Sequence, residues 1–255
     1  MHEHKTLKGL QIGDTLEEKL QILDDLGQKA NDIHNKLPFK GDDARLWIYK
    51  AMWGAVIVYA TTLRTFLYGD INQDGLLWIL GVNTPEEALE RQKGLMRSAK
   101  LTFNLETQFA IEAGLDVLLK AIVPGDKTGG FRDISKKILE KCGIADADKK
   151  ADILYVPALM RNCLHNAGVH GKQTYPPIQI GAVTFDFAKE ESVECIILES
   201  LVFAYTHGLD ILTEIVSSAA SLRFDSLLDP MKKYRAEQRA KAAAAAPAAP
   251  AAPGP

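Results

Sequence analysis

The stretch from Ala51 to Leu63 constrains the fold most, because it is uncharged and lies within a longer helical pattern. Apolar side chains occupy most of the circumference of the helix predicted from Asp43 to Tyr68. A helix that is apolar on nearly all sides must be covered by other elements or by lipid. The uncharged stretch is shorter than the roughly 20 residues that span a bilayer, and it contains Gly54 and two threonines. We therefore expect the central helix of a bundle and no membrane anchor.

Periodicity and capping signals predict helices along most of the remaining chain. They place these helices at about 15–36, 84–123, 133–141, 148–166 and 190–217. Pro157 predicts a kink or a break within the fourth of them. Alternating side chains at 178–180 and 183–187, joined by Gly181-Ala182, predict a small β-hairpin before the last long helix. The expected fold class is all-α, a helical bundle with this hairpin inserted.

The pattern predicts one α-helical domain over residues 1–220, without internal repeats. A separate C-terminal helix is expected over 221–245, starting at about Asp225. The final residues, 246–255, are only alanine, proline and glycine, and we expect a disordered tail there.

The charge of the chain excludes a general attraction to nucleic acid, since the formal net charge is −3. Two local stretches are basic. Between Lys127 and Lys172 there are nine Lys and Arg against five Asp and Glu, and between Arg223 and Lys241 there are six against three. Either stretch could contact RNA phosphates, although solvated helix faces often have the same composition.

Cysteine usage and the N-terminus indicate a cytoplasmic protein. The three cysteines, Cys142, Cys163 and Cys195, form no CxxC pair, which favours a reducing compartment. The N-terminal run from His2 to Lys5 does not lead into the apolar core of a signal peptide.

Metal and cofactor sites are not expected. The segment Asp70–Gly75 matches the first half of a calcium loop, but Gly81 stands where the bidentate acid is required, so an ordinary turn is favoured. The chain has neither an HExxH pair nor a phosphate-binding loop that ends in lysine and serine or threonine.

The concentrated candidate site is the segment from Arg161 to Gly168. On a helix Arg161 and His165 are four residues apart and share a face, as do Asn162 and Asn166 beside them. A histidine titrates near neutrality and can move a proton, while an arginine can hold a phosphate and stabilise its developing charge. This combination suits phosphodiester cleavage.

A purely structural role explains the same residues. Arg161 could pair with an acid such as Asp152 or Glu194, and His165 could cap carbonyls at the end of the helix. Residues 166–168 would then be only the helix stop. Cys163 points away from His165 on a helix, and we expect it to pack in the core.

The run from Leu159 to His170 resembles the signature of HEPN-type domains, which are helical bundles with an arginine, an asparagine and a histidine on a late helix. The resemblance covers about 101–218 and includes the hairpin followed by a long helix. It implies a homodimer with a composite cleft between two such helices, binding RNA and in many members cleaving it without metal. Carried over by position, Arg161 would hold the phosphate, His165 would act as general acid or base, and Asn162 would orient them.

The resemblance further suggests substrate contacts from Asn166, His170 and Lys172, and a cognate protein partner from a toxin–antitoxin, phage-defence or RNA-processing system. Only three residues separate Arg161 from His165, a shorter gap than is usual in the family. One residue of shift turns a side chain by about 100° around a helix. Two hypotheses therefore stand: an RNA-binding protein that acts as a metal-independent endoribonuclease, and a catalytically silent, dimeric interaction or regulatory module.

Overall fold

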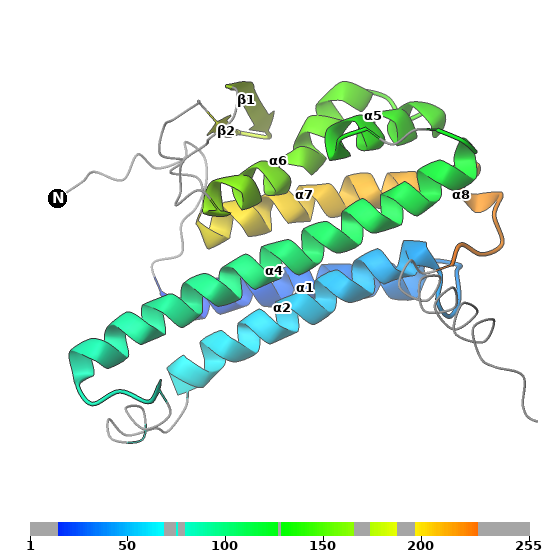
Figure 1. Ribbon diagram of the computed structural model, residues 1–255. Helices are drawn as coiled ribbons and strands as arrows, with labels where there is room; N and C mark the ends of the chain where they lie inside the picture. Colours follow the sequence, from blue (N-terminus) through cyan, green and yellow to red (C-terminus); the bar gives the residue numbers. More distant parts are fainter. Residues whose placement is uncertain are drawn as a thin grey trace, which may run out of the picture.

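The computed structural model describes residues 15–68, 75, 80–126, 129–165, 174–187 and 197–228, with the backbone alone at 66–68 and 164–165. Within these residues the chain forms seven helices and one antiparallel hairpin (Figure 1). The elements are α1 (Leu16–Lys36), α2 (Ala44–Tyr68), α4 (Pro85–Ile122), α5 (Phe131–Lys141), α6 (Ala147–His165), β1 (Tyr175–Ile180), β2 (Val183–Phe187), α7 (Leu198–Val216) and α8 (Ala219–Leu222). The mostly helical class, with a small hairpin before a later helix, is confirmed.

The helix starts follow from local capping. Thr15 Oγ1 accepts a hydrogen bond from the Glu18 backbone N–H at 3.2 Å, and Glu18 Oε2 accepts one from the Thr15 N–H at 3.0 Å. This reciprocal capping box satisfies two N–H groups that the first turn leaves without helical partners. Thr84 caps α4 in the same way through the Glu87 N–H, with a proline at the first helical position. Both starts lie where the sequence predicts them.

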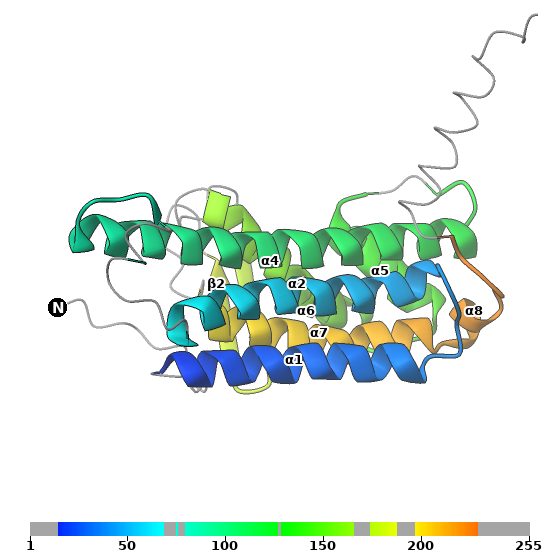
Figure 2. The same ribbon diagram turned by 90° about the horizontal axis from the view of Figure 1, so that it is seen from below.

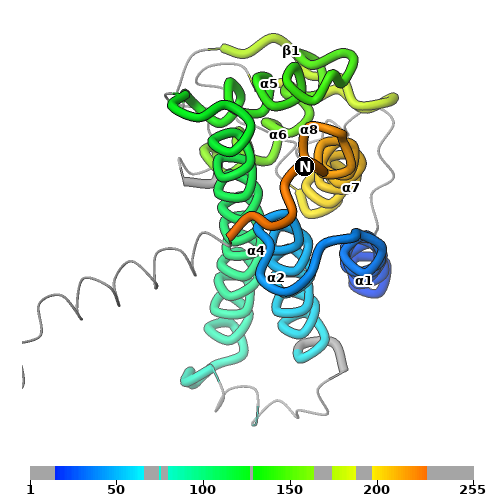
Figure 3. Tube along the Cα trace, turned by 90° about the vertical axis from the view of Figure 1, so that its right-hand side faces the viewer, coloured from blue at the N-terminus to red at the C-terminus, as the bar shows by residue number. Residues whose placement is uncertain are grey.

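Figures 2 and 3 show how the helices are arranged. The long helix α4 runs the length of the molecule, with α2 beside it and α1 on the other side of α2. Viewed end-on, α7 lies above α1 and α2, and α5 and α6 lie on the far side from α2. The core joins these layers through aromatic contacts: the Phe103 ring lies 5.8 Å from Tyr59 of α2 and 5.6 Å from Tyr205 of α7, centroid to centroid.

A buried glycine brings α2 and α4 together. A Cβ atom built on Gly114 would stand 2.5 Å from Cγ1 of Ile48. No ordinary contact is that short, so only glycine permits this approach of the two helices without a shift.

A buried ion pair closes the end of the bundle. Asp43 and Arg45, just before and within the first turn of α2, bond to one another and to the backbone of residues 221–227. Asp43 also forms a β-bridge with Leu228. We call these contacts the Asp43–Arg45 clamp. They fix the chain that follows α8 against the start of α2.

Three sequence predictions need correction. Ile197 is extended and serves as the N-cap of α7, so this helix begins at Leu198 and not near Glu190. Residues 225–228 are not helical, because Asp43 accepts the Leu227 N–H and forms a β-bridge with Leu228, and the rest of the expected C-terminal helix and tail lies outside the described residues. Of the two alternatives predicted at Pro157, the break is wrong, since α6 continues through this residue, and the kink stays a prediction.

The α2 helix is longer than its uncharged stretch. Over Ala44–Thr65 it is, by length and composition alone, long and apolar enough to cross a membrane, the one such helix among the described residues. Half of that segment is buried inside the bundle, and core helices of soluble proteins meet the same criterion. The absence of a membrane anchor stays a prediction.

Candidate functional site

The last two turns of α6 divide into a buried face and a partly open one. Leu159, Met160 and Cys163 are fully buried, whereas Arg161 and Asn162 are partly exposed. Burial raises the pKa of the Cys163 thiol to about 11. At neutral pH this thiol stays protonated and is a poor nucleophile. Its position in the core is the one that the sequence predicts.

The guanidinium of Arg161 is engaged by an acid from α4. Its Nη1 lies 3.1 Å from Oε1 of Glu112, and the two side chains are 26% and 32% exposed. Gln108 donates to the same Glu112 oxygen, also at 3.1 Å. From the sequence, an ion pair was one interpretation of Arg161. The prediction that Asp152 is the partner is wrong, because Asp152 accepts a 2.5 Å hydrogen bond from Arg132. Glu194, the other expected partner, lies outside the described residues.

The Glu112 contact belongs to a polar stripe along α4. Asn104, Gln108 and Glu112 are spaced four residues apart and so share one face of the helix. Asn104 is fully buried, donates to the Pro157 carbonyl at 3.3 Å and accepts from the Tyr205 hydroxyl at 2.6 Å. The stripe therefore ties α4 to both α6 and α7.

Sequence reasoning missed this polar stripe. Its signal was present, since an asparagine, a glutamine and a glutamate recur at four-residue spacing in the C-terminal half of α4. Burial raises the pKa of Tyr205 well above its ordinary value, so its hydroxyl remains a hydrogen-bond donor at physiological pH.

The basic stretch that precedes the site is largely neutralised. Nearby acids lie within ion-pair distance of four of its seven described Lys and Arg side chains, in the pairs Arg132–Asp152, Lys136–Asp148, Lys137–Asp126 and Lys150–Glu214. Because Arg161 is also paired, the described part of this stretch does not present a continuous surface of unpaired positive charge. This weakens the argument for RNA binding from composition.

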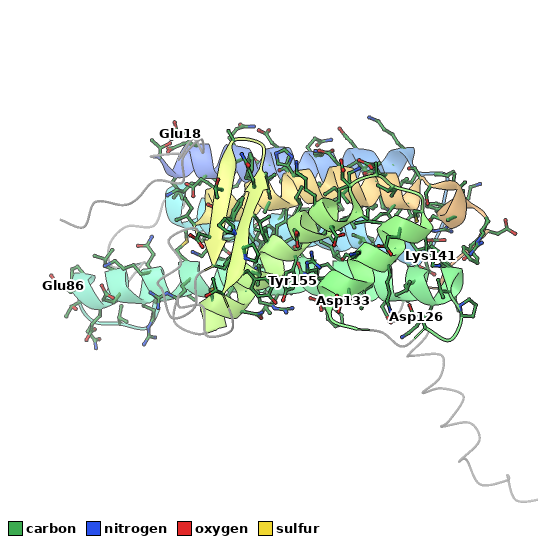
Figure 4. The ribbon with its side chains drawn as sticks, turned by 90° about the horizontal axis from the view of Figure 1, so that it is seen from above. Glu18, Glu86, Asp126, Asp133, Lys141 and Tyr155 are labelled. Carbon is green, nitrogen blue, oxygen red and sulfur yellow. The ribbon has the colours of Figure 1, made fainter. Side chains whose placement is uncertain are left out.

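A cleft of about 510 Å³ opens next to the site, between the start of α5, α6 and β1. Tyr155 of α6 and Tyr175 of β1 form one wall, with hydroxyl oxygens 3.3 Å apart and ring centroids 5.6 Å apart. Figure 4 shows Tyr155 between the hairpin and the start of α5, where Asp133 lies. Three charged side chains also line this cleft: Arg132 and Asp152, which bond to each other, and Asp133. Its walls thus combine aromatic rings with charged and polar groups.

The structure brings together only part of the predicted site. Arg161 and Asn162 occupy adjacent positions on α6, and His165 is its final residue, with a side chain that is not described. Asn166, His170 and Lys172 lie outside the described residues, as does most of the segment 70–75 that resembles a calcium loop. In the described part of the chain, no cluster of three or more His, Cys, Asp or Glu side chains could hold a metal ion.

Comparison with protein-family models, with curated proteins and with solved structures finds no match for the chain.

Proposed function

We propose that this protein is a HEPN-like helical interaction module in which Arg161 stabilises the bundle instead of cleaving RNA. The observation that carries the proposal is the ion pair between Arg161 and Glu112 at 3.1 Å. Support also comes from the order of elements, since a hairpin followed by a long helix after the Arg161 segment is what the sequence resemblance implies.

Glu112 opposes the use of Arg161 as a phosphate ligand. An incoming phosphate would have to displace the carboxylate and would meet its negative charge at close range. Gln108 holds that carboxylate from the neighbouring turn, which stabilises the paired arrangement further. Removing either partner of a half-buried pair leaves the other charge poorly solvated. Arg161 and Glu112 should therefore behave as one structural unit.

A double-mutant cycle tests this role. Arg161→Ala, Glu112→Gln and the double variant are compared by urea denaturation. Each single change should cost about 1 kcal/mol, and the double variant should lose less than the sum, because the two side chains are in direct contact. The matched control is Lys93→Ala, whose exposed pair with Glu90 on the same helix should contribute little. Additive losses, or none for Arg161→Ala, would contradict the structural role.

A second candidate function is metal-independent RNA cleavage. The observation that favours it is the partial exposure of both Arg161 and Asn162 at the end of α6, beside His165. If Arg161 contacts a scissile phosphate, Glu112→Gln should preserve or raise the activity by releasing the guanidinium, while Arg161→Ala abolishes it.

Cleavage of labelled total RNA and tRNA in excess EDTA separates the two functions. Activity in the wild type and in Glu112→Gln, lost in both Arg161→Ala and His165→Ala, would establish the nuclease. A folded wild-type protein that cleaves neither substrate leaves the interaction module as the function.

A further inference from the structure

Aromatic and proline side chains line much of the cleft between α5, α6 and β1. Its lining includes Phe131 of α5, Tyr155 of α6, and Tyr175 of β1 with the prolines at 176 and 177. The ring centroids of Phe131 and Tyr155 lie 6.5 Å apart, and those of Tyr155 and Tyr175 lie 5.6 Å apart. Both tyrosines are partly exposed, whereas Phe131 is 9% exposed. The three rings therefore form a row that crosses from α5 over α6 to the hairpin.

The charges in the cleft offset one another. Arg132 donates to the Asp152 carboxylate at 2.5 Å. Asp133 lies in the first turn of α5, where the partial positive charge of the helix N-terminus stabilises a carboxylate. A strongly charged ligand would therefore meet no large charge of opposite sign, and the cleft favours an uncharged ligand.

Arg132 also supplies hydrogen-bond donors to the cleft. Its Nε bonds to Asp152, and its Nη2 lies 3.5 Å from Asp148. Within the described residues, these bonds leave the Nη1 donors of Arg132 for a ligand. Carbonyl oxygens are the natural acceptors for such donors. The cleft thus suits a ligand that combines flat apolar groups with exposed carbonyls.

The sequence of residues 247–253 has this combination of groups. Pro247, Pro250 and Pro253 are three residues apart and are separated by alanines, and residues 242–255 have no charged side chain. A polyproline II helix has three residues per turn, so in this conformation the three prolines share one face. Its backbone carbonyls make no internal hydrogen bonds. Proline-rich segments of this type bind grooves lined by aromatic rings, because the preformed helix loses little entropy on binding.

The described chain ends at a place from which this segment can reach the cleft. Figure 1 shows α8 at the same end of the bundle as the turn between α4 and α5. Arg223, just after α8, donates to the Ile122 carbonyl of α4 at 3.1 Å, and α5 begins nine residues after Ile122, at Phe131. Residues 229–246 join Leu228 to Pro247 and span up to about 60 Å when extended. This is about twice the roughly 30 Å that nine extended residues cover.

We propose that the cleft lined by Phe131, Tyr155 and Tyr175 is a docking site for an uncharged proline-rich segment in the polyproline II conformation, and that residues 247–253 of the same chain occupy it. The prolines then lie on the aromatic rings, and Arg132 donates to a carbonyl of the segment. The inference goes beyond the proposed function, since neither Arg161 nor Glu112 takes part in it.

Binding of a fluorescein-labelled peptide with the sequence of residues 243–255, followed by fluorescence anisotropy, tests the docking. The recipient is the full chain, as the wild type and as the triple variant Pro247→Ser, Pro250→Ser and Pro253→Ser. In the wild type the attached segment competes at an effective concentration on the order of 1 mM. If the peptide binds an empty cleft with a dissociation constant of about 0.1 mM, it should bind the triple variant about tenfold more tightly than the wild type.

Two controls locate the binding. Tyr175→Ala, added to the triple variant, should abolish binding of the peptide, whereas Trp53→Ala, which removes a 40% exposed aromatic side chain from α2, should leave it unchanged. A peptide of the same composition with its prolines four residues apart, on three different faces of a polyproline II helix, should bind at least several-fold more weakly. Circular dichroism verifies that each variant is folded.

Each remaining outcome overturns a definite part of the proposal. Equal affinity of the peptide for the wild type and the triple variant overturns residues 247–253 as the occupant. Binding that survives Tyr175→Ala, or that ignores the spacing of the prolines, overturns the cleft as the docking site. A triple variant that is folded and binds no peptide at millimolar concentration overturns both. None of these results depends on the stability measurements at Arg161.

Discussion

Replacing Arg45 with alanine should be among the most destabilising single changes in this protein. Its guanidinium is 1% exposed and makes four hydrogen bonds: two to the Asp43 carboxylate at 2.8 and 2.6 Å, and one each to the Ser221 and Phe224 carbonyls at 2.7 and 3.0 Å. The Phe39 ring covers it at 3.5 Å from the centroid. Four of the five N–H groups of the guanidinium thus have a partner.

The magnitude follows from what the substitution leaves behind. Arg45→Ala strands a buried Asp43 carboxylate with only backbone N–H donors, and it leaves two carbonyls without the guanidinium. Breaking a buried ion pair by removing one partner costs about 3–5 kcal/mol. The whole free energy of unfolding of a domain is typically about 5–15 kcal/mol. The variant should therefore lose a large fraction of its stability.

Equilibrium urea denaturation, followed by circular dichroism, measures this loss. The matched control is Arg64→Ala, because Arg64 and Asp24 form an ion pair at 43% and 45% exposure, which should contribute at most about 1 kcal/mol. Limited proteolysis should also cut Arg45→Ala after Phe224 or Leu227, where the clamp no longer holds the chain.

A double variant sharpens the test. Asp43→Ala with Arg45→Met removes both charges, so it should be more stable than Arg45→Ala alone. The reasoning fails if Arg45→Ala loses no more stability than Arg64→Ala, or if the double variant is no more stable than Arg45→Ala.

Three further predictions concern pH, packing and reactivity. Burial alone would raise the pKa of Asp43, but hydrogen bonds from Arg45 and from backbone N–H groups outweigh it and the net pKa is lowered from 3.8. The clamp should therefore stabilise the fold fully above pH 4 and lose this contribution as pH falls further, and acid titration of Asp43→Asn should lack that component. Gly114→Ala should cost about 1–3 kcal/mol in urea denaturation because of Ile48, whereas Gly94→Ala, which meets no atom within 4 Å, should gain roughly 0.5–1 kcal/mol. Cys163, fully buried and with its pKa raised to about 11, should react with iodoacetamide at pH 8 only after unfolding, as peptide mass spectrometry can check.

The elements that local signals specify were predictable from the sequence. Thr15 with Glu18, and Thr84 with Pro85, mark helix starts through contacts within four residues, and both helices begin there. The hairpin is similarly local, since its turn at 181–182 joins two alternating runs. Where partners are close in sequence, pattern and structure agree.

The errors arise where a distant contact overrides a local pattern. Residues 225–228 begin the predicted C-terminal helix, but Asp43 accepts the Leu227 N–H at 3.0 Å and forms a bridge with Leu228. Nothing within ten residues of Leu227 signals this bond. The only signal in the sequence is an aspartate two residues before an arginine. Such pairs are common, and most of them are exposed.

The role of the candidate site was also hidden from local sequence patterns, because it depends on a contact between two distant helices. The four-residue spacing of Arg161 and His165 places both residues on one face of a single helix. It suggests catalysis only because it says nothing about the side chains that pack against that helix. Glu112 lies 49 residues earlier, on α4, and its carboxylate converts the arginine from an available phosphate ligand into half of an ion pair. The sequence contained this acid but not its distance from Arg161.

The short gap between Arg161 and His165 and the ion pair with Glu112 both favour a structural role for Arg161. A catalytic arginine must release its resting partner when substrate arrives, so the partner should be weakly held. Here Gln108 bonds to the Glu112 oxygen that faces Arg161, and Asn104, one turn further back, fastens the same face of α4 to Pro157 and Tyr205. Each contact lowers the freedom of the next, because all three side chains project from one rigid helix. A stripe built in this way favours a permanent bond between α4 and α6 over a ligand site that opens. Glu112→Gln should lower the free energy of unfolding if that bond is structural, and it should preserve or raise RNA cleavage if Arg161 holds a phosphate.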